Sequence, residues 1–430
     1  MNAIAQELTQ ELTQQLENIV GVGAVSPWQP ENLFLDPPPS CIVYPQTPEQ
    51  LGTVVSLARQ NQWRILPCGS GSKLHWGGIP KDINIVVSTA RMNQLIDHAS
   101  GDLTVTVQAG MKYAELQKIL AATGQFLALD PSYSDRATIG GIVATADTGS
   151  LRQRYNSVRD QLLGISFVRA DGQLTKAGGR VVKNVAGYDL MKLLTGSFGT
   201  LGIISQVTFR LYPLQAASQT VLLTGDSAAI NQASQTVRSS ALTPVALDIL
   251  SASIVETLDI GSGMGLLAKF SNVPESVAEQ SERLLAVGEK LGLKGISYSN
   301  DSEATLWQRL KKIIEENDSN ESILCKIGVR PTAAVATIEK VQGFGVIHAN
   351  SGLGRLRLSE ESASKSVLLN LRKICENHAG FLTILSASQE LKQQVDIWGY
   401  SGNALPLMQG IKHQFDPQNV LSPNRFICGI

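Results

Sequence analysis

Three glycine-rich segments of the sequence have the composition of loops that bring a ligand close to the backbone. They are residues 67–73 (PCGSGSK), residues 137–149 with Gly140, Gly141 and Gly149, and the stretch with Gly196, Gly199 and Gly202. Glycine has no Cβ, so another group can approach its backbone closely. Tight packing of a strand on a helix is the alternative explanation for any one segment. Because all three adjoin strand-like sequence in one half of the chain, we favour one extended ligand that passes all of them.

The elements around these segments alternate between strand and helix. Strands are predicted over residues 41–44, 63–67, 85–87, 103–108, 164–170 and 203–212, and helices over residues 113–122 and 188–194. Thr47 followed by Pro48 and, three residues after the cap, Gln50 predicts a helix start that carries an apolar stripe. Gly196 predicts the end of the helix before it. This alternation predicts an α+β sandwich for the first domain.

Four motifs taken together resemble a known family of flavoproteins. PCGSGSK, DPSYSDRATIGGIVATADTG, RYNSVRD and VKNVAGYDLMKLLTGSFGTLGII are similar to the FAD-binding domain of the vanillyl-alcohol-oxidase type, also called PCMH-type. Within that superfamily, KNVAGYDL and the C-terminal DPQNVLSPNRF most resemble the FAD-binding subunit of glycolate oxidase (glycolate dehydrogenase) that accompanies a larger FAD-containing subunit. The resemblance covers residues 36–214 and the C-terminal motif, and it is weak in between.

This resemblance implies FAD as the cofactor. It places the diphosphate at the first glycine segment, where successive backbone N–H groups form an anion-binding nest, and the isoalloxazine against Gly140 and Gly141. The residues that it places near FAD are Cys68, Gly69, Ser70, Gly71, Ser72, Lys73, Pro131, Ser132, Thr138, Gly140, Gly141, Ala144, Thr145, Gly149, Ser157, Asp160, Gly199, Thr200, Gly202, Ile203 and Asn424. Relatives that attach FAD covalently carry a histidine directly after the glycines. Here His75 lies beyond that place, so we expect non-covalent FAD.

Some positions depart from the family pattern. Asn156 replaces a glycine, but asparagine is the residue that most readily replaces glycine at positive φ, so we expect the turn to survive. Phe198 replaces a glutamate, and the C-terminal motif has Ser422 and Asn424 where the family has asparagine and glycine.

The length of 430 residues predicts more than one domain. We predict an N-terminal helical segment over residues 1–35, a two-subdomain PCMH-type FAD-binding domain over residues 36–214 and an α+β cap domain over residues 215–410. Residues 411–430, with a helix at 411–415, are expected to return towards the flavin. In the cap domain, helices are predicted at residues 274–291, 301–316 and 360–379, and strands at 220–223, 266–270, 323–329 and 346–348.

Composition and charge narrow the function class. The net charge of −1 and the pI of about 6.5 give no electrostatic basis for binding nucleic acid or an anionic membrane. The N-terminus lacks the basic and apolar regions of a secretory signal, and no apolar run is long enough to span a membrane. The five cysteines form no CxxC pair, so we expect reduced thiols, no iron–sulfur cluster and no bound metal. These features favour a cytoplasmic protein, with any membrane association made through partner subunits.

The cap domain offers few residues for chemistry. Relatives that oxidise 2-hydroxy acids by themselves carry paired histidines that hold a divalent metal, but His348 has no second histidine nearby. A lone histidine is more often structural than catalytic. Arg355 and Arg357 are able to bind a carboxylate through a bidentate fork, or to face solvent. His348 and Arg355 are therefore the only candidate catalytic residues.

Two functions remain open on this basis. In the first, the chain is a self-sufficient FAD-dependent 2-hydroxy acid dehydrogenase with a substrate site under the cap domain. In the second, it is an FAD-binding subunit of a glycolate dehydrogenase complex, with a larger FAD-containing catalytic subunit and an iron–sulfur subunit. The missing metal-binding histidine favours the second and predicts that the isolated chain oxidises glycolate poorly. A relative of UDP-N-acetylmuramate reductase is disfavoured, because KNVAGYDL and DPQNVLSP are not its signatures.

Overall fold

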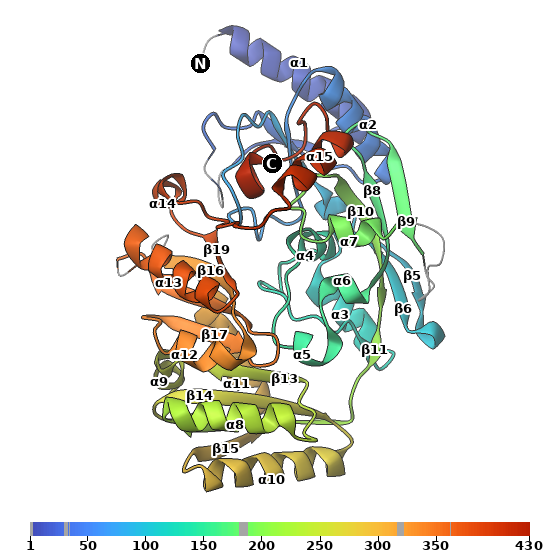
Figure 1. Ribbon diagram of the computed structural model, residues 1–430. Helices are drawn as coiled ribbons and strands as arrows, with labels where there is room; N and C mark the ends of the chain where they lie inside the picture. Colours follow the sequence, from blue (N-terminus) through green and yellow to red (C-terminus); the bar gives the residue numbers. More distant parts are fainter. Residues whose placement is uncertain (1–2, 30–32, 34, 180–187, 316–321, 362) are drawn as a thin grey trace. The chain divides into compact units, whose positions relative to one another are not determined.

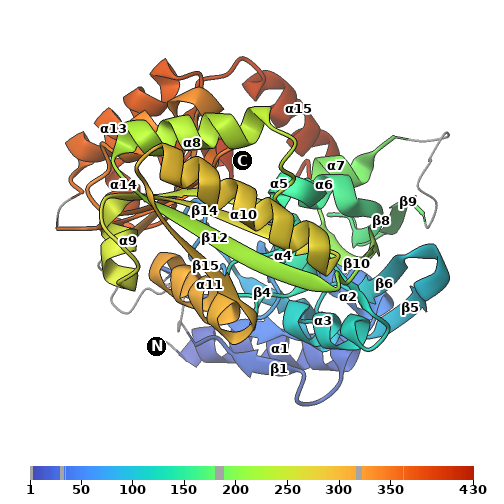
Figure 2. The ribbon, with the colours of Figure 1, turned by 90° about the horizontal axis from the view of Figure 1, so that it is seen from below.

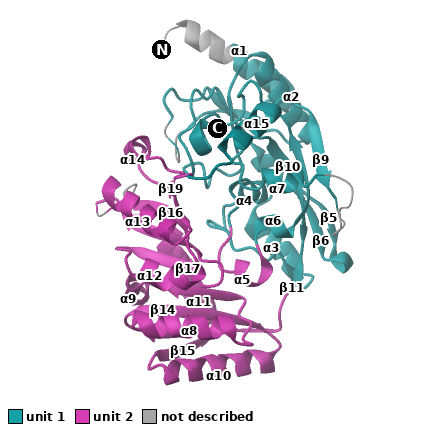
Figure 3. Cartoon of the chain, in the orientation of Figure 1, with its two compact units in different colours: residues 1–147, 157–213, 401–430 teal, residues 148–156, 214–400 magenta. Residues whose placement is uncertain are grey.

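The computed structural model describes the chain apart from residues 1–2, 30–32, 34, 180–187, 316–321 and 362 (Figure 1). The chain forms two compact units (Figure 3). Unit 1 contains residues 1–147, 157–213 and 401–430, and unit 2 contains residues 148–156 and 214–400. Helices and strands are mixed in both units, which confirms the predicted α+β class. Residues 183–187, the first part of the motif KNVAGYDL, lie outside the described residues.

A four-stranded sheet in unit 1 leads into the first glycine segment. Its order is β1-β2-β4-β3, with β2, β4 and β3 parallel and β1 antiparallel to β2. The strands are β1 (Val25–Pro27), β2 (Cys41–Val43), β3 (Ile65–Cys68) and β4 (Ile85–Ser88), and their helices are α1 (Ala3–Val20) and α2 (Pro48–Gln60). Thr47 caps α2 as predicted, because its hydroxyl accepts a hydrogen bond from the Gln50 N–H. Leu16, Leu51 and Ile85 lie in the core that these elements share.

A five-stranded antiparallel sheet forms the rest of the unit 1 framework. Its order is β5-β6-β10-β8-β9. The strands are β5 (Leu95–Ala99), β6 (Thr104–Gln108), β8 (Leu162–Val168), β9 (Leu174–Gly178) and β10 (Ile203–Arg210). The helices are α3 (Tyr113–Ala121), α4 (Ile139–Thr145), α6 (Val158–Gln161) and α7 (Leu190–Leu194), and α3, α4 and α7 contribute to its core. The strand predicted to reach residue 212 ends at Arg210, and β11 (Tyr212–Pro213) then pairs with β7 (Gln125–Phe126).

Residues 137–149 depart from the expected glycine-rich loop, because residues 139–145 form the helix α4. Thr138 is its N-cap and accepts a hydrogen bond from the Gly141 N–H. Each glycine costs about 1 kcal/mol relative to alanine inside a helix, so local propensity does not predict this element. Ile139, Ile142 and Val143 are buried in the core of the five-stranded sheet, and this burial outweighs the propensity.

Unit 2 is built on one eight-stranded antiparallel sheet. Its order is β15-β12-β14-β13-β17-β18-β16-β19. The strands are β12 (Ala217–Gly225), β13 (Ala246–Leu250), β14 (Met264–Asn272), β15 (Lys294–Ser299), β16 (Ser322–Gly328), β17 (Phe344–His348), β18 (Leu353–Ser359) and β19 (Phe381–Ser386). The longer helices are α8 (Ser227–Ser239), α10 (Pro274–Lys290), α11 (Asn300–Glu315) and α13 (Lys365–Asn377), and the short ones are α5 (Arg152–Tyr155), α9 (Ala252–Leu258), α12 (Ala334–Ile338) and α14 (Gln389–Gln394). Figure 2 shows α8 and α10 crossing β12 and β14.

One face of this sheet is apolar and packs against helices. Leu247, Ile347, Leu356 and Ile327 point to this face from four neighbouring strands and share a core with α8, α12 and α13. Side chains alternate between the faces of a strand, so the residues next to these in sequence lie on the opposite face. The opposite face therefore carries the polar residues of the same strands.

The C-terminal segment belongs to unit 1 and begins before the predicted helix. The helix α15 (Leu405–Phe415) starts ahead of residue 411, with a proline in its first turn. Beyond it, Lys412 Nζ donates to Asp416 Oδ2 at 2.6 Å and to the backbone oxygens of Thr200 and Leu421, each at 2.9 Å. Burial lowers the pKa of Lys412, which its ion pair with Asp416 opposes. In the described part of the chain, no helix is both long and apolar enough to cross a membrane.

Candidate functional site

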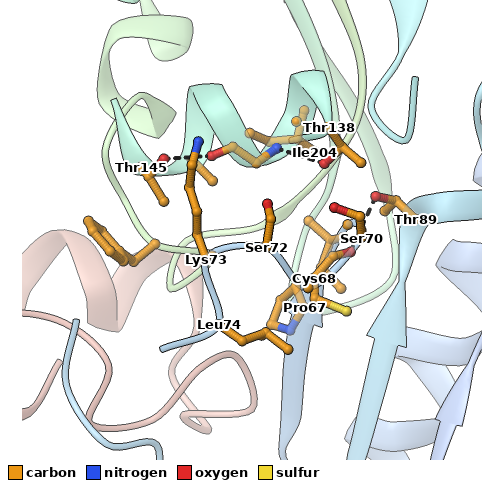
Figure 4. A pocket seen from close by; sticks show the side chains of 18 of the residues that line it. Pro67, Cys68, Ser70, Ser72, Lys73, Leu74, Thr89, Thr138, Thr145 and Ile204 are labelled. Carbon is orange, nitrogen blue, oxygen red and sulfur yellow. Dashed lines mark hydrogen bonds between the residues drawn. The ribbon is translucent and has the colours of Figure 1, made fainter. Parts of the chain in front are cut away.

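A pocket in unit 1 brings together the three glycine-rich segments (Figure 4). It has about 730 Å³ of atom-free space, part of it open to solvent, which is within the size range of small-molecule sites. The predicted cofactor residues that line it are Cys68, Gly69, Ser70, Gly71, Ser72, Lys73, Thr138, Gly140, Gly141, Ala144, Thr145, Gly199, Gly202 and Ile203. Lining residues absent from that prediction are Pro67, Leu74, Thr89, Ala137, Phe198, Ile204 and Arg425.

The first glycine segment leaves β3 and is held in place by hydroxyl groups. Ser88 Oγ donates to the Gly69 oxygen at 2.8 Å. Thr89 Oγ1, which lines the pocket (Figure 4), donates to the Cys68 oxygen at 3.3 Å. A Cβ at Gly69 would overlap the Thr138 side chain, so only glycine lets the loop pass the N-cap of α4. Gly71 has a φ of +83°, which favours glycine as well. Sequence and packing therefore fix the loop shape before any ligand binds.

The glycine pair of α4 has two different roles. A Cβ at Gly140 would lie 2.7 Å from the Cβ of Ala109, and the Gly140 N–H donates to the Ala109 oxygen at 2.7 Å. Gly140 is thus required by packing inside the protein, whereas the sequence-based argument assigned its missing side chain to the flavin. A Cβ at Gly141 would meet only Thr138 Oγ1, at 3.1 Å. Gly141 is the member of the pair whose missing side chain leaves space at the pocket.

The third glycine segment lies between α7 and β10. Gly199 has a φ of +76°, and an added Cβ would lie 3.2 Å from the Pro67 Cγ of the first segment. A Cβ at Gly202 would lie 2.6 Å from the ring of Phe167 on β8. Phe198, which stands where the family pattern has a glutamate, lines the pocket with its φ at 53°. Packing against neighbouring strands therefore explains why these glycines precede a buried strand.

Lys73 lines the pocket and belongs to a buried ion pair. Its Nζ lies 2.6 Å from Asp147 Oδ2, and the Lys73 and Asp147 side chains are 6% and 0% exposed. The same carboxylate oxygen accepts the Ser132 N–H at 2.9 Å. Figure 4 shows the Lys73 side chain extending towards the end of α4 near Thr145. The pair ties the first glycine segment to the residues that directly follow α4, and the charge of Lys73 is largely balanced inside the protein.

Arg425 is a pocket residue that the sequence-based prediction lacks. Its Nη2 donates to the Leu74 oxygen at 2.6 Å and its Nη1 to the Gly78 oxygen at 3.0 Å. Burial lowers the pKa of Arg425 to about 9, which leaves the guanidinium charged at neutral pH. It occupies the position of the lysine that ends the family motif D-P-x-x-x-L-N-P-G-K, and that basic residue was the available signal. The neighbouring Asn424 has a φ of 67°, as suits a residue in a glycine position.

The other predicted cofactor residues do not line the pocket. Ser157 and Asp160 form a capping box at the start of α6. Thr200 donates to the Ser197 oxygen at 2.7 Å, and Asn424 donates to the Ile79 oxygen at 2.8 Å. Pro131 and the buried Ser132 lie outside the lining, and Gly149 belongs to unit 2. Asn156 has a φ of 65°, which confirms the expected positive φ at that position.

The polar face of the unit 2 sheet contains a buried acid–base pair. Asp248 on β13 lies opposite His348 on β17, and His348 Nδ1 is 2.6 Å from Asp248 Oδ1. Asp248 is 0% exposed and His348 is 9% exposed. Residues opposite each other in an antiparallel pair share a face of the sheet. Asp248 was missed by sequence reasoning, although a single carboxylate within the apolar run VALDIL is a recognisable signal.

Two cations extend this polar face along the next strands. Arg355 on β18 lies opposite Val346, two residues before His348, and Lys326 on β16 lies opposite Arg355. The register thus places both cations on the same face as Asp248 and His348. Arg355 Nη2 donates to the Thr148 oxygen at 3.3 Å. Arg357 is engaged elsewhere, since its Nη1 donates to the Ile313 oxygen on α11 at 2.8 Å.

Metal binding has no support among the described residues. In that part of the chain, no group of three or more His, Cys, Asp or Glu side chains is arranged to hold a metal ion. The cysteines are free, with Cys41, Cys325 and Cys375 buried and Cys428 exposed.

The pocket of unit 1 fits FAD by its shape and by its charge. The backbone of the first segment and the open side of Gly141 make a cradle that larger side chains would fill. Arg425 is 4% exposed and has no carboxylate partner among the described residues, so an anionic group such as a diphosphate would complement it. The lining residues from the three glycine segments and Arg425 would hold the cofactor.

Comparisons with known proteins agree with this assignment. Residues 39–178 match the family model described as "FAD binding domain". The glycolate oxidase subunit GlcD of Bacillus subtilis is 23% identical over 91% of this chain and 89% of its own length. A D-lactate dehydrogenase of Archaeoglobus fulgidus is 26% identical over 90% of this chain and 91% of its own length.

The fold also matches a solved structure over nearly its whole length. The structure of p-cresol methylhydroxylase with substrate bound has a TM-score of 0.76 at 15% identity and covers 97% of this chain and 96% of its own. The expected PCMH-type fold is thus confirmed, and the match to the FAD-binding domain model confirms the expectation of FAD. Residues 39–178 are thus similar to the FAD-binding domain family, and the chain is an FAD-dependent oxidoreductase.

Proposed function

We propose that the chain oxidises a 2-hydroxy acid such as glycolate or D-lactate with FAD, and that the substrate binds at the polar face of unit 2. The observation that carries this proposal is the buried pair of Asp248 and His348, on the same sheet face as Arg355. The names of the two relatives, which specify glycolate and D-lactate, support the substrate class.

The Asp248–His348 pair has the arrangement of an oriented general base. A carboxylate only accepts hydrogen bonds, so the shared proton lies on His348 Nδ1, and Nε2 keeps its lone pair. His348 Nε2 then takes the proton of the substrate hydroxyl, and Asp248 stabilises the imidazolium that forms. Arg355 pairs with the substrate carboxylate, because a guanidinium binds carboxylates through two parallel hydrogen bonds. These residues orient the α-carbon and activate its hydroxyl.

The oxidation to a 2-keto acid balances with these groups. The hydroxyl proton goes to His348 and afterwards to solvent, and the hydrogen of the α-carbon leaves with two electrons as a hydride. FAD, when bound, supplies the hydride acceptor.

Sequence reasoning alone favours a subunit without its own substrate site, since it finds no second histidine near His348. Asp248 changes this assessment, because a histidine oriented by a buried carboxylate is able to act as a base in its own right. This pair therefore favours a substrate site within this chain, which the second function had denied to it, and it leaves open whether the chain also needs partner subunits for turnover.

A stopped-flow experiment tests the proposal. The FAD-loaded chain is mixed anaerobically with millimolar glycolate, D-lactate or L-lactate, and the loss of oxidised flavin absorbance is followed. We expect reduction within seconds by at least one of these acids and none by the matched carboxylates without a hydroxyl, acetate and propionate. No reduction by any 2-hydroxy acid would leave the chain without a substrate site of this kind.

We also propose that the chain works as a cytoplasmic subunit of a complex with a larger FAD-containing catalytic subunit and an iron–sulfur subunit. The name of the Bacillus subtilis relative, a glycolate oxidase subunit, supports membership of a complex. We expect fast flavin reduction but slow steady-state turnover of glycolate by the isolated chain, because re-oxidation depends on the partners. Affinity purification of the tagged chain from its native host should recover both partners in fixed ratio. Recovery of the chain alone, with full turnover, would contradict the assembly.

FAD is proposed to be bound without a covalent link. His75, the nearest histidine to the first glycine segment, does not line the pocket, and its Nε2 lies 3.3 Å from the Tyr133 hydroxyl. Acid precipitation should therefore release all of the yellow chromophore into the supernatant. Flavin that stays with the pellet would refute this point.

A further inference from the structure

The segment of residues 148–156, which groups with unit 2, contacts the groups that the proposed reaction uses. In sequence it lies between α4 and α6, which are both elements of unit 1. Ser150 Oγ donates to Asp248 Oδ2 at 2.5 Å, and the Thr148 oxygen accepts the hydrogen bond from Arg355. The short helix α5 in this segment packs on β13, the strand of Asp248. One short segment thus forms hydrogen bonds with both Asp248, which orients the proposed base, and Arg355, which is proposed to bind the substrate carboxylate.

Ser150 completes the hydrogen bonding of a fully buried carboxylate. Asp248 Oδ1 binds His348 Nδ1 and Asp248 Oδ2 binds Ser150 Oγ, so each oxygen has its own donor. A buried charge needs such partners, because it has lost its contacts with water. With both oxygens bound, the carboxylate is fixed in rotation and Oδ1 stays in line with Nδ1. Without the hydroxyl, Oδ2 becomes a second acceptor that competes with Oδ1 for His348.

The hydroxyl of Ser150 is bound to the acid and not to the imidazole. A serine nucleophile needs a base within hydrogen-bond reach of its hydroxyl, and a histidine normally fills that role. Here the hydroxyl donates to Asp248, and the same carboxylate holds His348. The arrangement therefore suits a residue that orients the base, and not a nucleophile.

We propose that Ser150 is a positioning residue for the oxidation: through Asp248 it holds the His348 imidazole in the Nδ1–H tautomer, with Nε2 free to accept the substrate proton. This inference rests on the proposed function for its kinetic consequence. Its structural consequence, the tautomer of His348, is independent of any substrate. The two consequences are therefore measured separately.

The kinetic experiment compares Ser150→Ala, Ser150→Thr and Ser239→Ala in the FAD-loaded chain. Ser239 is an exposed serine on α8 of the same unit, so its substitution is the matched control. Loss of one hydrogen bond to a charged group is expected to lower the flavin reduction rate at saturating substrate about tenfold in Ser150→Ala. The apparent dissociation constant of the substrate should change less than twofold. Ser150→Thr, which keeps the hydroxyl, should retain most of the wild-type rate.

The structural experiment measures directly which imidazole nitrogen of His348 carries the proton. The chain has five histidines, so ¹⁵N labelling of histidine gives a small set of signals, and His348→Gln assigns the relevant one. In the wild type, the ¹⁵N shifts of His348 should show a protonated Nδ1 and an unprotonated Nε2. In Ser150→Ala they should move towards a mixture of both tautomers, with Ser150→Thr resembling the wild type. Circular dichroism and FAD content verify that each variant is folded and loaded.

The outcomes separate this inference from the function on which it rests. An unchanged tautomer in Ser150→Ala overturns the inference, whatever the rates are. Equal losses of rate in Ser150→Ala and Ser150→Thr also overturn it, because they would show a packing role for residue 150. If the wild type is reduced by no 2-hydroxy acid, the proposed function fails, and the ¹⁵N shifts alone decide whether Ser150 positions His348.

Discussion

The pocket of unit 1 and the polar face of unit 2 are built in opposite ways. The pocket is lined mainly by backbone and small side chains of three sequence segments, and its lysine, Lys73, is already paired with Asp147. The polar face is made of Asp248, His348 and Arg355, which come from three different strands. The pocket thus depends on the shape of the chain, whereas the polar face depends on individual functional groups. Substitutions in the pocket should therefore affect FAD binding, whereas substitutions on the polar face should affect the rate of flavin reduction.

The largest expected effect is a loss of the flavin reduction rate without a loss of bound FAD. His348→Gln removes the proposed base, and Asp248→Asn places an amide donor where Nδ1 needs an acceptor. Each should lower the rate of flavin reduction by about 10³-fold or more, since a mispositioned or missing base costs several powers of ten. Stopped-flow reduction measures this rate, and the FAD content should remain at the wild-type level. Wild-type rates in both variants would place the base elsewhere.

The second prediction tests whether Arg355, and not Arg357, binds the carboxylate of the substrate. Arg355→Met removes the proposed carboxylate partner and should lower kcat/KM by about 10²-fold, mainly through a higher KM. Arg357→Met is the matched control on the same strand, because its guanidinium donates to the Ile313 oxygen on α11. Steady-state kinetics with an artificial acceptor measure both. Equal losses in the two variants would mean that neither arginine is specific for the substrate.

The third prediction tests whether the backbone conformation of the first glycine segment determines the affinity for FAD. In Gly69→Ala the new Cβ overlaps Thr138, so the loop or the N-cap of α4 must shift, and FAD should bind about tenfold more weakly. Gly101→Ala is the control, because no atom lies within 4 Å of its Cβ position. Fluorescence titration of the apo chain with FAD measures both affinities. An unaffected Gly69→Ala would show that the loop adapts more easily than its packing indicates.

The smallest expected effect concerns a pocket side chain that should stay inert. Burial raises the pKa of the Cys68 thiol to about 12, so the thiolate is a minor form near neutral pH. The labelling rate of Cys68 by iodoacetamide should rise about tenfold per pH unit between pH 8 and pH 10, because the thiolate is the reactive form. The exposed Cys428 should be labelled first at pH 8. Peptide mass spectrometry quantifies both sites, and labelling of Cys68 as fast as Cys428 would contradict its raised pKa.

The pocket was largely predictable because its signal is local. Glycines that pack against Thr138, Ala109 and Phe167 stand in short motifs, so the motifs identify the region even though the glycines also serve internal packing. The turn at Asn156 and the cap at Thr47 were predictable for the same reason. The helix α4 was not, because its core contacts outweigh the poor propensity of two glycines.

The polar face was harder to predict because its signal is not local. Asp248 and His348 are 100 residues apart in sequence and meet only through the pairing of β13 with β17. A single sequence gives no register for such a pair, so His348 looked isolated. Arg425 shows the same problem within unit 1, since the loop oxygens that it binds lie hundreds of positions earlier.

The division of unit 1 has a consequence for how the protein is made. Apart from residues 148–156, unit 2 lies between residues 213 and 401, so Lys412 and Arg425 are synthesised after the whole of unit 2. Until these two residues leave the ribosome, the carbonyl oxygens in and after the first glycine segment lack the Arg425 guanidinium that binds them. The pocket then also lacks Arg425 as a lining residue. Domains fold as they emerge, which lets unit 2 form first and leaves unit 1 to close by long-range contacts. Flavin loading is therefore a late event, after translation has finished, and a nascent chain stalled before residue 412 should carry none.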